Sequence, residues 1–578
     1  VPMFNFSPAQ PSDIWGQANG SGSSGRDGGD AISNLNPEDI ESLTVLRGAS
    51  AAALYGSQAA NGVILVTTKK GKSGSTQVDF NSNLTFESPV YLPELQFTYG
   101  QTAAGAQDSW GNKVNAADHV KDFFQTGQTW INSVALSGGN KTAQTYFSYA
   151  NTNASGIIPT SSLQRHNVTL RETATFFNNR LDVGASLNYT NQKGENRASS
   201  GLYYNALTGL YFFPRGLNFD TYKTDYEVES RARNTKVQNW IADNDNQQNP
   251  YWILNRNPNS DVRNRYLGAV TAKLKITNHL ALQARGNYDR TFDTYDHRSF
   301  ASTQGTLADA NGRYILQQNE GSQRYGDLIL MYGKSNDNIS FNANIGTSTA
   351  KTKLYTESFD SKGAGGGVGL NFANVFSIQN MRVGGPYLIE ITQPWAYFSQ
   401  RLARQDLQSV FGSFQVGYQS KIYLDVTGRN DWSSTLAFTD NNSFFYPSVG
   451  LTGILSEMLN IRSLDFWKVR ASYAQVGNAV IPYDTNPLNR ISSVSGLSIN
   501  TVGPLPDTDL KPEVSKSLEI GTDIRFWNNR VGLDLTWYKT NTTNQRLSIS
   551  APFGSGFTQY IINAGDIQNS GIEALLNI

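Results

Sequence analysis

The sequence predicts an all-β membrane protein built on a large antiparallel transmembrane β-barrel. Three observations predict this fold class: strands that alternate apolar and polar side chains, connections that are either very short or very long, and an unusual composition. Of 578 residues, 16 % are charged and 38 % hydrophobic, both below the share usual in soluble domains, while 12 % are aromatic. Such a chain suits a wall on which lipid-facing and water-facing residues alternate.

The charge balance and the absence of cysteine narrow the function classes. Lys plus Arg and Asp plus Glu both number 47, so no net positive field points to nucleic acid as a partner. The chain has no cysteine, which is compatible with export. No apolar run approaches the roughly 20 residues of a membrane helix. If the chain spans a membrane, it does so as a closed barrel, because lipid offers no partner to unpaired backbone groups.

The first element predicted along the chain covers residues 36–71. An apolar strand leads into a turn of helix rich in small residues, which Tyr55 and Gly56 break, and a second strand at 62–68 runs into Lys69-Lys70-Gly71. This segment resembles the second half of the plug domain of TonB-dependent outer-membrane transporters, and more narrowly the SusC/RagA class. The residues that carry the resemblance are Asn36, Pro37, Asp39, Ile40, Arg47, Ala49, Ser50, Tyr55, Gly56, Asn61 and Gly62.

One position of this segment departs from the family pattern. Where Lys-Asp is expected, the chain has Arg47-Gly48. The basic charge is kept and the acidic charge is lost, so no ion pair of that acid is expected. The resemblance implies that residues 1–71 sit inside the barrel and that Lys69-Lys70 leads toward a first wall strand at Thr76 to Phe86.

The strands that follow show a period of two. Leu181–Tyr189 places apolar side chains at every odd position, and the same alternation recurs in 270–276, 280–288 and 531–539. Strands of about nine or ten residues cross a bilayer when tilted. A soluble β-sandwich has the same period, so periodicity alone leaves both folds open. In the barrel we expect Leu533, Leu535 and Trp537 to face lipid, and Asp534, Thr536 and Tyr538 to face the lumen.

The connections between strands favour the barrel. Asn178–Arg180, Thr277–His279 and Asn528–Arg530 are short and polar, whereas other connections run to about 35, 50 and 75 residues. The long connections are expected at 289–323, 356–407 and 191–265. Tight turns at one end and long loops at the other are typical of outer-membrane barrels. We therefore expect the three short turns on one side of the membrane and the long loops on the other.

The resemblance also extends over the barrel. The segments that carry it, in the family's order, are Gly428–Leu436, Phe445–Leu451, Val469–Asn478, Asp509–Gly521 and Ile562–Glu573. Family barrels have about 22 strands around a plug. The resemblance therefore implies an incomplete chain, with residues 1–72 as the C-terminal half of the plug and 73–578 as a barrel truncated at its C-terminal end. The signal peptide and TonB box are expected outside this chain.

No catalytic, metal or cofactor site is predicted. Gly20–Gly25 has the spacing of a dinucleotide-binding loop but lacks its strand and helix. Asp243–Asn246 lacks the glycine and distal glutamate of a calcium loop, and the four histidines have no metal-ligand spacing. We therefore expect neither enzyme activity nor a cofactor.

Ligand contacts are expected from aromatic side chains in the long loops. The candidates are Trp240, Tyr251, Trp252, Trp395 and Tyr397. Exposed aromatic rings stack on sugar rings or hold apolar peptide side chains. The alternative is that these residues pack the loops against each other or form a docking face for a partner.

The resemblance implies TonB-dependent import of a glycan or oligopeptide across the outer membrane of a Gram-negative bacterium. It implies three partners besides this ligand: a SusD-like lipoprotein over the mouth, the TonB complex acting on the plug, and outer-membrane lipid around the barrel. The alternative is a scaffolding subunit of a larger outer-membrane assembly that keeps the fold without the import role, which the absence of a TonB box would favour. The sequence leaves the substrate, the oligomeric state and bound ions open.

Overall fold

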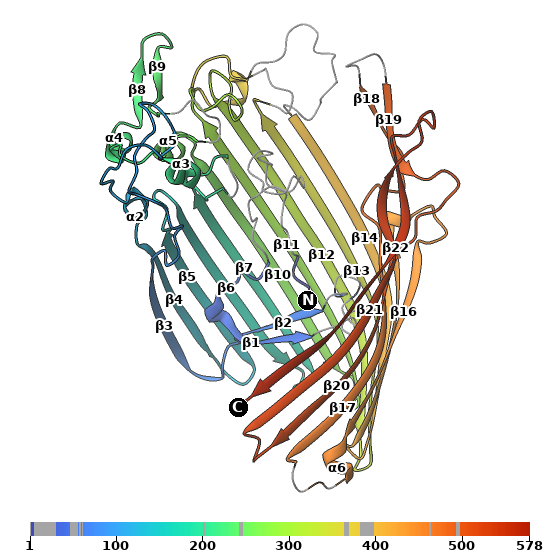
Figure 1. The fold of residues 1–578 in the computed structure, drawn as a ribbon. Helices are drawn as coiled ribbons and strands as arrows, with labels where there is room; N and C mark the ends of the chain where they lie inside the picture. The colour runs from blue at the N-terminus through green and yellow to red at the C-terminus, as the bar shows by residue number, and fades with distance from the viewer. Residues whose placement is uncertain are drawn as a thin grey trace.

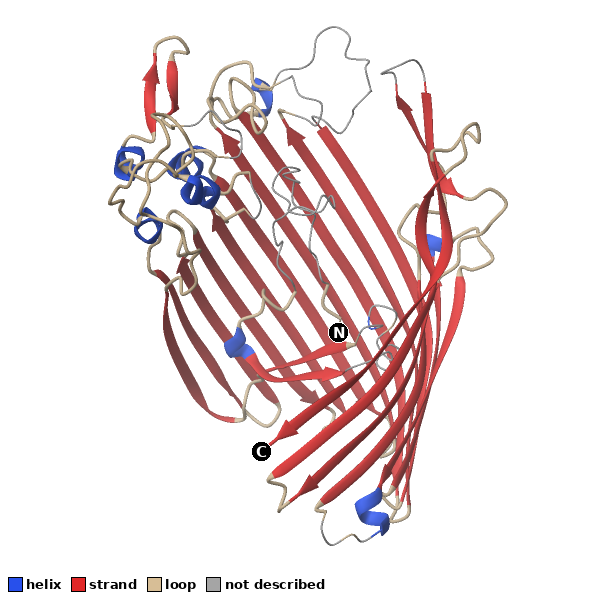
Figure 2. Cartoon of the chain, in the orientation of Figure 1, coloured by secondary structure: helices blue, strands red, loops and turns tan. Residues whose placement is uncertain are grey.

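The computed structural model describes residues 2–4, 31–46, 56, 59, 62–199, 203–241, 247–362, 369–381, 398–459, 461, 464–492 and 498–578. Long tilted antiparallel strands form a curved wall, and a small two-stranded sheet lies within the space that the wall surrounds (Figure 1). Strands dominate the molecule, and helices are few and short (Figure 2). The predicted all-β barrel fold is confirmed.

The wall strands follow one another around the barrel in chain order. They are β3 (Gly74–Glu87), β4 (Gly127–Gly139), β5 (Ala143–Ser155), β6 (Ser162–Phe176), β7 (Leu181–Glu195), β10 (Asn259–Lys275), β11 (Leu280–Ser299), β12 (Arg313–Ser335), β13 (Ile339–Asp360), β14 (Phe398–Tyr418), β15 (Ile422–Ser433), β16 (Ser443–Ile454), β17 (Phe466–Asn478), β20 (Glu513–Phe526), β21 (Val531–Ser550) and β22 (Gln559–Asn577). Antiparallel ladders join each strand to the next, including β7 to β10 and β17 to β20.

The remaining elements lie inside or at the ends of the wall. The inner sheet pairs β1 (Ile40–Leu46) with β2 (Val63–Thr68), and β18 (Leu488–Ser492) pairs with β19 (Ser498–Pro504). The helices and the other hairpin are η1 (Pro37–Asp39), α2 (His119–Phe123), α3 (Ala206–Phe212), α4 (Phe219–Thr224), β8 (Glu227–Ser230), β9 (Thr235–Gln238), α5 (Pro250–Arg256), η4 (Ile378–Asn380), η5 (Ser434–Leu436) and α6 (Leu455–Leu459). Among the described residues, every helix is too short or too polar to cross a bilayer.

Two of the short turns have the same backbone. Asn178 and Asn179 have φ of 52° and 65°, and Asn528 and Asn529 have 58° and 60°. Asparagine adopts this left-handed conformation more readily than most residues, which explains the repeated Asn-Asn-Arg.

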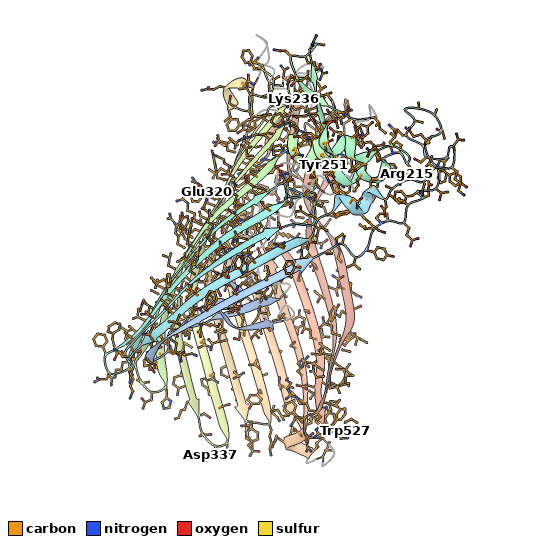
Figure 3. All side chains as sticks on the ribbon, turned by 90° about the vertical axis from the view of Figure 1, so that its left-hand side faces the viewer. Arg215, Lys236, Tyr251, Glu320, Asp337 and Trp527 are labelled. Carbon is orange, nitrogen blue, oxygen red and sulfur yellow. The ribbon has the colours of Figure 1, made fainter. Side chains whose placement is uncertain are left out.

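The short turns and the long loops occupy opposite ends of the wall. Trp527 precedes the last short turn and lies at one end of the barrel, whereas Lys236 and Tyr251 lie at the opposite end (Figure 3). The turns at 178–180 and 277–279 line one recess, so they share an end with each other. We call these ends the turn end and the loop end. The predicted separation is confirmed for the described loops, while Trp395 lies outside the described residues.

All three predicted long loops are shorter than expected because their strands continue. The connection expected at 191–265 covers 196–258, since β7 runs to Glu195 and β10 begins at Asn259. The connection expected at 289–323 covers only 300–312, since β11 runs to Ser299 and β12 begins at Arg313. The connection expected at 356–407 covers 361–397. Beyond Tyr288 the outward positions of β11 are mostly polar or charged, so the alternation that marks a lipid crossing is lost. The backbone ladder nevertheless continues, because hydrogen bonding does not depend on the side chains.

The wall faces of β21 are as predicted. Arg470 Nη2 donates hydrogen bonds to Asp534 Oδ1 at 2.8 Å and Thr536 Oγ1 at 2.6 Å. Arg470 shares a strand face with Ala474, which packs in one buried cluster with Ala59 of the enclosed segment. Asp534 and Thr536 therefore face the lumen. The opposite face of the strand carries Leu533, Leu535 and Trp537.

Candidate functional site

The contact between the enclosed segment and the inner wall is the candidate functional site. The turn η1 (Pro37–Asp39) follows Asn36, whose side chain accepts a hydrogen bond from the backbone N–H of Glu38 (3.2 Å). Proline at the first helical position has no N–H to leave unpaired there. The chain then continues into β1, whose pairing with β2 holds the hairpin together.

Asp39 is the buried acid at this contact. Its side chain is 4 % exposed, and its two carboxylate oxygens accept hydrogen bonds from Tyr146 and Thr169 of the wall, each at 2.8 Å. The Asp39 backbone carbonyl accepts a bond from Lys69 N–H at 2.8 Å, which fixes the end of β2 beside it. One residue thus couples η1, the hairpin and two wall strands.

A buried ion pair on the inner wall holds two further stretches of backbone. Arg265 Nη2 and Asp289 Oδ2 are 2.6 Å apart, and their side chains are 3 % and 0 % exposed. Asp289 accepts a bond from Phe4 N–H (3.0 Å), while Arg265 donates to the carbonyls of Phe4 (3.0 Å) and Ala31 (3.2 Å). The ion pair thus makes hydrogen bonds with both the N–H and the carbonyl group of Phe4. It therefore holds the backbone of this residue and not its side chain.

Gly56 of the predicted plug motif lies against a second buried pair. Arg429 Nε donates to Asp431 Oδ1 at 2.7 Å, and its Nη2 donates to Ser409 Oγ at 2.6 Å. Gly56 has φ of 86°, and a Cβ added there would lie 3.1 Å from Arg429 Nη2. The left-handed backbone favours glycine, and the close guanidinium leaves little room for a side chain.

Other contacts of the enclosed segment also use polar wall side chains. Asn167 and Thr190 both donate to the backbone carbonyl of Asn34, at 2.8 and 3.0 Å. Arg171 donates to the carbonyl of Thr68 at 2.9 Å. In the described residues the apolar cluster at this contact is small, comprising Ala59, Ala474 and Val476 with Val63 packed against it. Among the described residues, hydrogen bonds therefore dominate the attachment.

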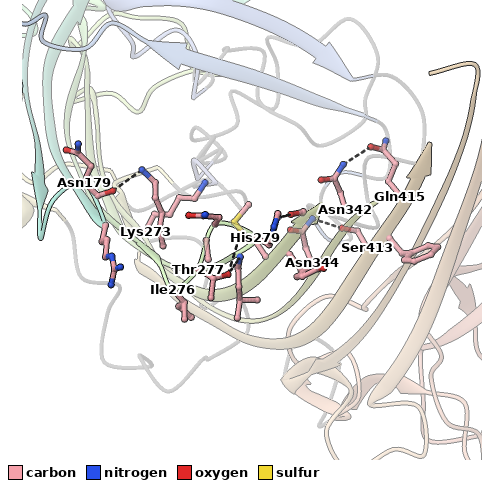
Figure 4. A pocket seen from close by; sticks show the side chains of 18 of the residues that line it. Asn179, Lys273, Ile276, Thr277, His279, Asn342, Asn344, Ser413 and Gln415 are labelled. Atoms are coloured by element: carbon pink, nitrogen blue, oxygen red, sulfur yellow. Dashed lines mark hydrogen bonds between the residues drawn. The ribbon is translucent and has the colours of Figure 1, made fainter. Parts of the chain in front are cut away.

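A polar recess of about 890 Å³ opens on the inner wall at the turn end (Figure 4). Amide and hydroxyl groups line one side: Asn342 Nδ2 donates to Gln415 Oε1 at 3.4 Å, and Asn344 Nδ2 to Ser413 Oγ at 3.0 Å. The other side carries the side chain of Lys273. Such a surface offers hydrogen bonds to a hydrated ligand, with the apolar side chains of Ile276, Met331 and Phe414 beside them.

The predicted ligand-contact aromatics are packed together in the loops. Trp252 is 1 % exposed and its Nε1 donates to Thr303 Oγ1 at 3.1 Å, while Tyr251 is 8 % exposed. Trp240 packs against Phe213 with ring centroids 5.5 Å apart. This is the arrangement that the loop-packing alternative predicts. Trp395 and Tyr397 lie outside the described residues.

Short helices hold this aromatic cluster in place. Each begins after a side chain that accepts a hydrogen bond from the second helical N–H, as helix N-caps do. The caps are Asp118, Asn205, Asn218 and Asn249. Burial raises the pKa of Tyr251 to about 12, with smaller contributions from Asp220 and Asp122, so its hydroxyl stays neutral.

The structure describes only part of the predicted plug motif. Asn36, Pro37, Asp39, Ile40, Gly56 and Gly62 are described, whereas Arg47, Ala49, Ser50, Tyr55 and Asn61 lie outside the described residues. Sequence reasoning missed the wall partners Arg265, Asp289, Arg429 and Asp431. Their signal was present as charged residues at lumen-facing positions of strands. In the part of the chain that the structure describes, no three acidic, histidine or cysteine side chains are grouped as metal ligands.

Two protein families match this chain, one over the barrel wall and one over the enclosed segment. Residues 212–578 match the family described as "TonB dependent receptor-like, beta-barrel". Residues 15–63 match the family "TonB-dependent Receptor Plug Domain". The chain belongs to the TonB-dependent receptor family. This family consists of outer-membrane β-barrel receptors of Gram-negative bacteria and not of enzymes, so the predicted location and non-enzymatic class are confirmed.

Individual TonB-dependent receptors resemble the chain over most of its length. It is 27 % identical to the TonB-dependent receptor P26 of Formosa agariphila over 94 % of this chain and 54 % of the relative. It is also 27 % identical to the TonB-dependent receptor SusC of Bacteroides thetaiotaomicron, over 94 % of this chain and 55 % of SusC. The chain therefore spans about half the length of the curated relatives it matches.

Solved TonB-dependent receptors share the fold. The structure of the RagAB peptide importer in the open-open state superimposes with a TM-score of 0.75 at 20 % identity, covering 94 % of this chain and 63 % of that chain. The siderophore receptor PirA of Acinetobacter baumannii gives 0.53 at 15 % identity. Together with the 27 % identity to SusC, this shared fold confirms the predicted resemblance to the SusC/RagA class.

Proposed function

We propose that this receptor imports a large polar nutrient, a glycan or an oligopeptide, across the outer membrane by TonB-dependent displacement of its plug. Residues 1–72 act as the C-terminal half of the plug and residues 73–578 as the barrel. The proposal rests on one observation above all: the described residues of the enclosed segment are attached to the wall mainly through hydrogen bonds. Water can replace such bonds as the plug moves, whereas a large apolar contact would have to be exposed at a high free-energy cost.

The polar lining of the lumen supports a hydrophilic ligand. The recess at the turn end is lined by amide, hydroxyl and lysine side chains together with Ile276, Met331 and Phe414. A ligand that passes the plug meets polar groups there that replace part of its hydration shell. The resemblance to the SusC/RagA class implies a glycan or an oligopeptide as ligand, and the likeness to the RagAB peptide importer supports a peptide. Ligand contact by Trp240, Tyr251, Trp252, Trp395 and Tyr397 stays a prediction.

Two protein partners complete the proposal. A SusD-like lipoprotein covers the loop end, where the described aromatic cluster gives it a firm surface, and the TonB complex pulls on the plug from the turn end. RagAB is a peptide importer, and its likeness to this chain supports a RagB-like lid here. The loop end is accordingly extracellular and the turn end periplasmic.

Uptake by intact cells tests the proposal. The full-length receptor would be purified from its host, its co-purifying ligand identified by mass spectrometry, and uptake of that ligand measured with and without a protonophore. We expect uptake that requires the receptor and falls to background when the proton gradient collapses. Uptake that is unchanged by deletion of the receptor gene would contradict import and favour the scaffolding role.

A further inference from the structure

The outer face of β11 to β14 carries a compact group of cations. Strand register places Arg290, Ser322, Lys353 and Arg404 in one row across the four strands. The adjacent row toward the turn end consists of Tyr288, Arg324, Lys351 and Asp406. We call Arg290, Arg324, Lys351, Lys353 and Arg404 the cationic patch.

The patch points away from the lumen. Asp289, next to Arg290, binds the plug, and Gln323, next to Arg324, is 1 % exposed beneath it, so alternation turns both arginines outward. Figure 3 shows Glu320, which pairs with Arg290, on the outer side of the wall.

Acidic side chains neutralise the patch only in part. Arg290 lies 3.1 Å and Lys353 3.9 Å from Glu320, and Lys351 lies 3.2 Å from Asp406. Five cations thus face two carboxylates. Lys351 stays 59 % exposed and Lys353 40 %. A net positive surface remains, available to an anion from outside the protein.

The depth of the patch coincides with the expected headgroup level. Outward residues between the turn end of β11 and Tyr288 are apolar or small, beginning at Leu280 and Leu282. Arg290 lies ten residue steps beyond Leu280 along the strand. At about 3.3 Å per residue and a tilt of about 40°, this rises about 25 Å, which is the height of the apolar band of an outer-membrane barrel.

An apolar recess opens in the wall beside the patch. It has a volume of about 500 Å³ and lies where Gly268 and Gly286 leave the outer surface without side chains. Leu187, Val270 and Tyr288 form its walls, with Glu172 at its far edge. Tyr288 belongs to the same register row as Arg324 and Lys351, so the recess begins where the cationic patch ends.

We propose that the cationic patch and this recess form a binding site for a lipid with a multiply phosphorylated headgroup in the leaflet at the loop end. The phosphates contact the cations, and an acyl chain lies in the recess. Arg290 and Arg404 are three strand spacings apart, about 14 Å, which is wider than one phosphate requires and suits two on one headgroup. Each cation near an anionic membrane surface adds attraction that salt weakens.

Lipid retention by the full-length receptor in detergent tests this site. The probes are diphosphoryl lipid A, monophosphoryl lipid A and phosphatidylethanolamine, with bound lipid counted by native mass spectrometry. The test variant is Lys351→Gln/Lys353→Gln. The matched control is Lys516→Gln/Lys539→Gln, which removes two exposed outward lysines from neighbouring strands β20 and β21. Both variants should keep the heat-modifiable gel mobility of a folded barrel.

We expect diphosphoryl lipid A to bind the parent at least fivefold more tightly than the monophosphoryl form, and phosphatidylethanolamine to bind most weakly. The patch variant should lose at least fivefold in affinity for diphosphoryl lipid A, and the control should match the parent. Raising salt from 50 to 500 mM should release this lipid from the parent, a measurement that needs no variant. Equal loss in both variants, or retention that salt and phosphate number leave unchanged, would overturn the proposal.

Discussion

Asp39 illustrates how single residues attach the plug. Its position follows from the local Asn-Pro-Glu-Asp turn, which the sequence makes evident, but its partners Tyr146 and Thr169 lie over a hundred residues away. Asp289 and Arg265 likewise contact Phe4, which lies 285 and 261 residues away, and their own pairing depends on the register of β10 with β11. Charged residues at lumen-facing positions could be predicted from the sequence. Which of them meet the plug could not, because it depends on how far the hairpin reaches into the lumen.

Replacing Asp39 should loosen the plug. Asp39→Ala removes two hydrogen bonds to a carboxylate and leaves two wall hydroxyls without their acceptor, a loss of roughly 2 to 4 kcal/mol of docking free energy. We expect faster cleavage of residues 31–71 by an added protease in the folded, detergent-purified barrel. Glu38→Ala is the control, because the Glu38 side chain is half-buried and makes no such paired contact. Equal cleavage rates for the two variants would refute this role of Asp39.

His119 should make the loop cluster sensitive to acid. Its ring is buried against Phe213 and Phe219, and Nε2 donates to the Leu210 carbonyl at 2.9 Å. Burial lowers its pKa, with a further contribution from Arg215. Because the unfolded side chain has a pKa of about 6.5, the stability that neutral His119 provides is complete above that pH and is lost as pH falls below it.

Hydrogen–deuterium exchange of α3 measures this pH dependence. After correction for intrinsic rates, amides of residues 206–212 should exchange faster at pH 5 than at pH 7.5. His119→Gln, which cannot titrate, should remove most of the difference. A parent protein with equal corrected rates at both pH values would show that His119 does not control the loop.

The elements differ in how well their sequences specify them. The crossings of β7, β10 and β21 could be predicted because lipid on one side and water on the other impose a period of two. The upper parts of β11 to β14 could not, since both faces are polar where the strands leave the membrane. The loop aromatics were recognised as a group, but their mutual packing depends on short helices whose only signal is a series of Asn and Asp caps.

The two faces of β21 should respond differently to an added charge. Leu535→Arg places a cation toward lipid at an expected cost of about 2 to 4 kcal/mol near the midplane. Tyr538→Arg places the same side chain in the lumen. We expect the first to impair barrel assembly, seen as loss of the heat-modifiable gel shift, and the second to preserve it. Thr536 is unsuitable as the lumen control because its hydroxyl already accepts a hydrogen bond from Arg470. Equal shifts for both variants would contradict the assignment of faces.

At the scale of the whole molecule, a polar wall surrounds a plug that is attached by replaceable hydrogen bonds. Composition, turn asymmetry and the motif at 36–71 were enough to predict a barrel with an internal plug. The extent of the wall and the individual plug contacts required the structure, because they depend on pairings between residues far apart in the chain.

A disulfide that locks the plug to the wall tests whether the plug must move for import to occur. Ala59 and Ala474 belong to one buried cluster between plug and wall, and the chain has no cysteine to interfere. In the full-length receptor, Ala59→Cys/Ala474→Cys should reduce uptake of the co-purifying ligand at least tenfold when oxidised. Reductant should restore uptake, and each single variant should behave like the parent. Full uptake by a receptor that is completely cross-linked would show that this part of the plug stays in place during import and would contradict import by plug displacement.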